Sequence, residues 1–157
     1  MMAINNTRVK TEFDSIDEAI RKVENHTGDA EIASYLSSFL AVMVCGVYED
    51  CIEHLICQRA AKAQDSEIYQ YVKSSIAESF RNPKFARIVE ILTKFSRVYS
   101  DNLKNNIEEK SKVALDSIVD NKNAIAHGRP SNVTILDIKD YHNRCIPIFE
   151  LLENILA

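Results

Sequence analysis

The sequence predicts an all-α protein, a single bundle of about five or six helices around one long central helix. Apolar residues recur every three or four positions along most of the chain, which is the period of a helix buried on one face. The 157 residues include only three Gly and three Pro, few for the turns of a many-stranded fold. This length favours one domain, residues 1–157. We expect a helix within residues 1–28 to lie at its periphery.

The overall composition is that of an ordinary globular protein. Charged residues make up 27% of the chain and hydrophobic residues 46%. The formal net charge of −4 gives the whole molecule no attraction for nucleic acid. Any RNA or DNA site must therefore be local.

The cysteines and the polar start of the chain indicate a reducing compartment. Three of the four cysteines, Cys45, Cys51 and Cys57, fall six apart in one predicted helix and cannot easily pair. Residues 1–10 do not resemble a signal peptide. The most apolar run, residues 35–48, is too short to cross a bilayer. We expect a cytoplasmic protein with no membrane partner.

The first two predicted helices differ in length and in apolar surface. The first covers residues 12–25, with a narrow apolar stripe. The second, residues 30–63 with Asp29 as its N-cap, carries a broad apolar stripe, which makes it the central helix. Gly46 in its middle would allow a bend or close helix packing, at a cost of about 1 kcal/mol relative to Ala.

The third and fourth predicted helices are separated by a strong local signal. The third begins at Asp65 and continues to Phe80. Asn82 is then predicted as the N-cap of the fourth helix, with Pro83 at its first position. Residues 81–97 hold five basic residues and one acidic residue. This arc is either a solvated charged face or an electrostatic surface for a polyanion.

The last two predicted helices flank a polar loop. Ser100 and Asp101 are expected to cap the fifth helix, whose apolar side continues to Ile125. The loop that follows leads to Thr134, whose spacing from Asp137 resembles a capping box. The final helix then continues to the end of the chain.

The end of the fifth predicted helix holds the densest run of candidate chemical groups. Gly128 is suited to the position after the C-cap and Pro130 cannot continue a helix, so His127 should be the last helical position. Asn123 lies one turn earlier on the same face. Lys122 is five residues before His127 and points elsewhere, so one chain would not bring the two together. A second chain could.

These residue types suit chemistry on a phosphate. His127 could transfer protons, with Asn123 holding a ring nitrogen or a substrate oxygen. Lys122 and Arg129 add positive charge that could stabilise a phosphate in a transition state. The alternative is that His127 only caps its helix.

Cys51 and His54 are three apart on one helix, a spacing that a metal ion could use. A structural zinc site needs four ligands, and the sequence offers no two others with supporting spacing. Buried helical cysteines usually behave as small apolar residues. We predict no metal and no cofactor.

The segment Lys122–Gly128 resembles the signature of the HEPN superfamily, all-α domains whose motif is Arg, four to six residues, and then His. The likeness extends to a long apolar helix with an acidic turn at 47–53, an Asn-Pro sequence at Asn82 and a Val-Thr start to the last helix. These features resemble the RiboL-PSP branch of the superfamily, from about Ala30 to the end of the chain.

The resemblance implies a metal-independent endoribonuclease that acts as a homodimer. Two motif helices would meet across the dimer, and RNA would be cleaved to 2′,3′-cyclic phosphate and 5′-hydroxyl ends. It implies His127 as general base or acid, Lys122 as the phosphate-stabilising cation, Asn123 as the polar orienter and Arg129 as a substrate-binding residue. A toxin or antiviral defence effector is expected, with a cognate antitoxin or regulatory protein as a further partner.

One departure from the family pattern leaves other interpretations open. The position that usually holds Arg is Lys122, which lacks the planar fork that grips a phosphate with two hydrogen bonds. A non-catalytic HEPN module that binds RNA, a nucleotide or a protein partner is the main alternative. A purely structural helical adaptor is the third interpretation.

Overall fold

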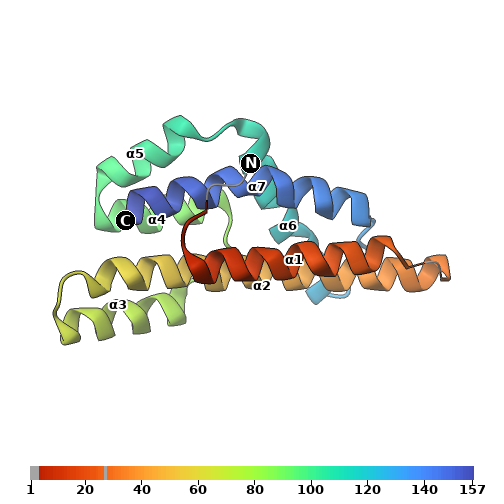
Figure 1. Cartoon of the computed structure of the whole chain (residues 1–157), viewed down its shortest axis with the longest axis horizontal. Coiled ribbons are helices and arrows are strands. Elements are labelled where there is room, and N and C mark those ends of the chain that lie inside the picture. Colours follow the sequence, from red (N-terminus) through yellow and green to blue (C-terminus); the bar gives the residue numbers. More distant parts are fainter. Residues whose placement is uncertain (1–3, 27) are drawn as a thin grey trace.

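The computed structural model describes residues 4–26 and 28–157, so residues 1–3 and 27 of the predicted domain lie outside it. This part of the chain forms seven helices and no strand, which confirms the all-α class. Figure 1 shows the helices in order: α1 Thr7–Glu24, α2 Ala30–Ala61, α3 Ser66–Ser79, α4 Phe85–Phe95, α5 Arg97–Asn106, α6 Glu109–Ala126 and α7 Ile135–Leu156.

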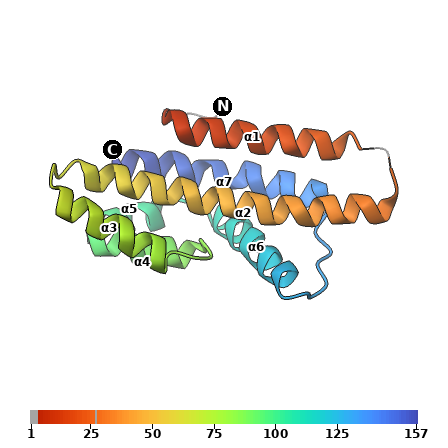
Figure 2. The same ribbon diagram turned by 90° about the horizontal axis from the view of Figure 1, so that it is seen from below.

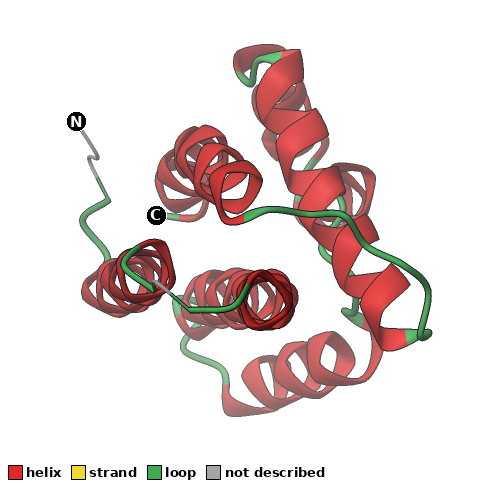
Figure 3. Ribbon diagram, turned by 90° about the vertical axis from the view of Figure 1, so that its right-hand side faces the viewer, coloured by secondary structure: helices red, strands yellow, loops and turns green. Residues whose placement is uncertain are grey.

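The predicted central helix is α2, which contacts α1, α3, α6 and α7. Figure 3 looks nearly along α2 and shows the other helices arranged around it. Its buried side chains recur at helical spacing, among them Leu40, Val44, Tyr48, Ile52 and Ile56. By length and hydropathy alone α2 could also cross a membrane, but a helix at the centre of a bundle needs the same composition.

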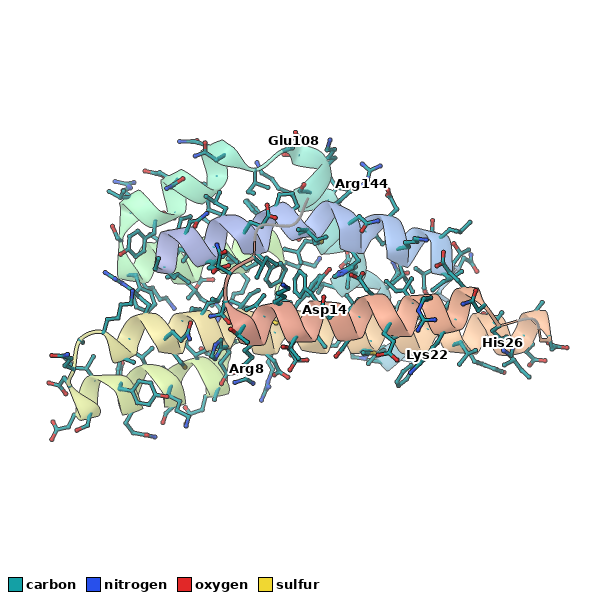
Figure 4. The ribbon with its side chains drawn as sticks, in the orientation of Figure 1. Arg8, Asp14, Lys22, His26, Glu108 and Arg144 are labelled. Atoms are coloured by element: carbon teal, nitrogen blue, oxygen red, sulfur yellow. The ribbon has the colours of Figure 1, made fainter. Side chains whose placement is uncertain are left out.

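Helices α1 and α7 run along α2, whereas α6 crosses it at an angle (Figure 2). The apolar face of α1 is buried, and its Phe13 ring packs against Tyr48 of α2 and Phe149 of α7. Its other sides carry charged residues, among them Arg8, Asp14 and Lys22, which Figure 4 labels. α1 therefore contributes to the core of the domain.

Several predicted helix starts are confirmed by their caps. Asp29 and Asp65 accept backbone N–H groups at the starts of α2 and α3. Thr134 and Asp137 form the reciprocal capping box of α7, as predicted. α1 begins earlier than its apolar pattern indicated, because Asn6 caps it by accepting the N–H groups of Arg8 and Val9.

The predicted fifth helix is wrong in its bounds, because it is two helices. Ser96, rather than Ser100 or Asp101, caps α5. Between α5 and α6 the backbone is extended at Ile107, whose side chain is buried. Both helices bury a face against the same core, so their apolar spacing continues across the break, and neither Gly nor Pro marks it.

The predicted start of the fourth helix is also wrong. α4 begins at Phe85, after Lys84, whose side chain provides no cap. The N–H of Phe85 instead donates to Oδ1 of Asp116 on α6, at 2.8 Å. The carboxylate of Asp116 thus caps α4 in place of Asn82. Asn82 itself has a left-handed backbone with φ of 56°.

Candidate functional site

The end of α6 is fixed in the conformation that its sequence predicts. His127 is the C-cap, and Gly128 follows with φ of 65°. The N–H of Gly128 donates to the carbonyl of Ile125 at 3.0 Å, and that of Arg129 donates to Ala124 at 2.8 Å. These two bonds form a Schellman motif, which satisfies carbonyls that the helix end would otherwise leave open. The position of His127 on the surface is therefore well defined.

Three of the predicted site residues present unengaged side chains at this end of the helix. His127 and Arg129 are exposed, and Asn123 is partly buried. Within residues 4–26 and 28–157, none of these three side chains forms a hydrogen bond or an ion pair. They are available to a ligand or to a partner chain.

Lys122 points away from His127 and into the protein. Its ammonium Nζ donates to Oδ1 of Asn82 at 2.9 Å, and the N–H of Asn82 donates to Oε1 of Glu49 on α2, also at 2.9 Å. Burial raises the pKa of the neighbouring Cys45 thiol to about 12; the charge of Glu49 raises it as well, while that of Lys122 opposes the shift. The charges of Glu49 and Lys122 therefore both act on the part of α2 around Cys45.

The structure divides the predicted constellation into two parts. Lys122 is hydrogen-bonded to Asn82, which is hydrogen-bonded to Glu49. His127 lies with Asn123 and Arg129 at the exposed helix end. As the five-residue spacing indicated, the described chain brings Lys122 and His127 into no contact. Asn82 and Glu49 were not predicted as site residues. Only the acidic turn after the apolar run could have suggested Glu49.

The comparison with known families agrees with the fold and with the motif. A model of the family described as RiboL-PSP-HEPN matches residues 7–157, which include all seven helices. The chain belongs to the RiboL-PSP-HEPN family. No curated protein and no solved structure matches the chain. The resemblance drawn from the Lys122–Gly128 segment is thereby confirmed at the level of a HEPN-type domain.

Three of the five basic residues within 81–97 of this HEPN domain pair with carboxylates of the protein itself. Lys84 pairs with Asp120 of α6 at 2.6 Å, and Arg87 and Lys94 both pair with Glu90. These pairs favour the solvated charged face over a continuous surface for a polyanion. The Lys84–Asp120 pair also fastens the start of α4 to the motif helix.

The candidate metal ligands Cys51 and His54 of the HEPN domain have no further ligands beside them among the described residues. Cys51 is buried, and burial raises the pKa of its thiol to about 12, so it is not a thiolate at neutral pH. His54 faces the guanidinium of Arg8 at 3.5 Å. No group of three or more His, Cys, Asp or Glu side chains within the described residues could hold a metal ion.

Proposed function

We propose that the protein is a metal-independent endoribonuclease of the HEPN type, acting as a homodimer in a toxin or antiviral defence role. The observation that carries the proposal is the fixed, exposed helix end, where His127 stands beside unengaged Asn123 and Arg129. A lysine ammonium on the same helix is held in place by Asn82. Family membership places these groups in a HEPN domain.

An exposed apolar surface on α2 supports the homodimer. We call it the α2 stripe; it consists of Ile32, Tyr35, Phe39 and Val42, which are 48%, 66%, 63% and 39% exposed. These residues follow one another at spacings of three, four and three, the pattern with which two helices pack side by side. Contiguous apolar surface of this kind marks a site of association. We take a second copy of the chain as its partner.

The α2 stripe leads directly to the proposed site. Gly46 and Glu49 continue its spacing, and Glu49 holds the N–H of Asn82, which in turn holds Lys122. Lys122 of α6 is therefore bonded, through Asn82, to the same face of α2 that carries the stripe. A Cβ added at Gly46 would meet no atom within 4 Å, so this glycine leaves room that a partner helix could use. Docking of two chains through the α2 stripe would bring together the two copies of α6, the helix that carries the motif.

The chemistry follows from these groups. His127 of one protomer removes the proton of a ribose 2′-hydroxyl, and the oxygen attacks the adjacent phosphorus. The bond from phosphorus to the 5′-oxygen breaks, and His127 of the partner subunit protonates the departing oxygen. Lys122 stabilises the charge that develops on the phosphate, Asn123 orients a substrate oxygen, and Arg129 binds a neighbouring phosphate. The products are a 2′,3′-cyclic phosphate and a 5′-hydroxyl.

The test uses purified full-length protein and a labelled RNA in EDTA. We expect cleavage that leaves 2′,3′-cyclic phosphate ends and that stops when the 2′-hydroxyl at the cleaved position is replaced by hydrogen. His127→Ala should lower the rate by about 100-fold or more, whereas the exposed His26→Ala should not change it. Absence of cleavage, or equal rates for His127→Ala and the parent, would overturn the proposal.

The contact between Lys122 and Asn82 favours one second candidate, a non-catalytic module that binds RNA or a nucleotide. One of the three ammonium N–H groups is already taken, and Lys cannot make the two-pronged contact of an Arg. On this candidate the parent binds RNA without cleaving it, and Lys122→Arg does not create cleavage. A gel-shift titration beside the cleavage assay separates the two functions.

A further inference from the structure

Asn82 holds a backbone conformation that few side chains adopt. Within the described chain, Asn82 and Gln64 are the two residues other than Gly with positive φ, at 56° and 53°. Gln64 lies in the exposed turn between α2 and α3, whereas Asn82 is partly buried between α2 and α6. Strained conformations of this kind persist where the surroundings fix them, and they occur often at functional sites.

Both the backbone and the side chain of Asn82 are held by hydrogen bonds. The N–H donates to Glu49 on α2, and the side-chain oxygen accepts from Lys122 on α6. An ammonium group can only donate, so the amide must present its oxygen and not its nitrogen to Lys122. The orientation of the Asn82 side chain is therefore determined, as is the position of the ammonium group.

We propose that Asn82 is a positioning residue that holds the Lys122 ammonium in the orientation needed to meet an RNA phosphate. This inference rests on the proposed function and names a residue outside the His127 motif. A lysine side chain has four rotatable bonds, and a fixed acceptor reduces the positions that its ammonium samples. Two N–H groups remain for phosphate oxygens. Such preorganisation is effective because the cation need not reorient when charge develops.

A merely structural role for the contact is the competing explanation. The turn before α4 is already tied to α6 by two other contacts: Lys84 with Asp120, and the N–H of Phe85 with Asp116. The turn is thus anchored without the bond between Asn82 and Lys122. If Asn82 acts through Lys122, its removal should affect cleavage and leave the fold in place.

The test replaces Asn82 by Gly, which adopts positive φ without strain and removes only the side chain. We expect Asn82→Gly to keep the thermal midpoint of the parent and to lower kcat by about 10- to 100-fold, with KM changed by less than about threefold. Gln64→Gly is the matched control, because Gln64 is the other described non-Gly residue with positive φ and lies in the exposed turn between α2 and α3, with no bond to Lys122. It should leave both kinetic constants unchanged.

A double variant shows whether Asn82 acts through Lys122. Asn82→Gly combined with Lys122→Ala should cleave no more slowly than Lys122→Ala alone, because the group that Asn82 positions is then absent. Additive losses, or an unchanged kcat in Asn82→Gly, overturn the positioning role while cleavage by the parent keeps the proposed function. A parent that cleaves no RNA overturns both.

Discussion

Tyr48 and His142 form a hydrogen bond inside the core, with the hydroxyl oxygen 2.7 Å from Nδ1 of the imidazole. Tyr48 is 0% and His142 1% exposed, and Phe13 packs against both rings. The bond joins α2 to α7 next to α1. Among the described residues, Nε2 of His142 has no hydrogen-bond partner, and the nearest carboxylate oxygen, on Asp17, lies 3.4 Å away.

The burial of His142 predicts that stability falls in acid. Desolvation lowers its pKa from 6.5 to about 4, so the folded protein keeps a neutral imidazole. Well above pH 6.5 the imidazole is neutral in both the folded and the unfolded state, and the stability is full. As the pH falls from 6.5 to about 4, the unfolded chain takes up the proton first. The free energy of unfolding should then decrease by up to about 3 kcal/mol.

Urea unfolding at several pH values between 4 and 7 measures this loss. His142→Phe cannot be protonated and should lose much of the pH dependence in this window, although it removes the imidazole partner of the Tyr48 hydroxyl at a cost of about 1 to 3 kcal/mol. The exposed His26→Gln should keep the slope of the parent. Burial raises the pKa of Asp17, which works in the opposite direction, so Asp17→Asn should steepen the loss. A His142→Phe variant with the parental slope would contradict the assignment.

Phe39→Glu should separate the proposed dimer. Phe39 is 63% exposed in the single chain, so a charge there should change the stability of the monomer by less than about 0.5 kcal/mol. In a stripe packed against its copy, two facing carboxylates would be buried together at high cost. Analytical ultracentrifugation should show a dimer for the parent and a monomer for the variant, with RNA cleavage lost as well. Leu136→Glu, at a residue 67% exposed on α7, is the control and should remain dimeric.

Gly46→Ala should have opposite effects on the monomer and on the dimer. Nothing lies within 4 Å of the added Cβ, and Ala favours a helix over Gly by about 1 kcal/mol. At concentrations where the chain is monomeric, the variant should therefore unfold at a higher temperature than the parent. If a partner helix approaches at Gly46, the added methyl group weakens the dimer, which is measured by its dissociation constant. A variant that dimerises as tightly as the parent would remove Gly46 from the interface.

Local signals in the sequence were sufficient wherever a helix end is made by its own residues. Asp29 and the pair Thr134 and Asp137 cap the helices that follow them, as predicted, and Asp65 caps the helix that was predicted to start there. Gly128 ends α6 at His127, also as predicted. These interactions span three or four residues, so the order of residues determines them.

The two misplaced boundaries have a different cause. The start of α4 is capped by Asp116, 31 residues away, and Ile107 leaves the helical conformation in order to enter the core. Neither the capping role of Asp116 nor the burial of Ile107 can be identified from residues that are close in the sequence. Asn82 resembled an N-cap because its type suits that position, but Lys122 and Glu49 hold it in another conformation.

The all-α class, the central helix, the family signature and the place of His127 at a helix end follow from the order of residues alone. Each of these depends on periodicity or on contacts within one helical turn. The packing of the helices sets where the Lys122 charge lies and which residues hold it, and it leaves the α2 stripe uncovered. The contacts of Lys122 with Asn82 and of Asn82 with Glu49 join residues that are 40 and 33 positions apart, and packing around α2 brings them together.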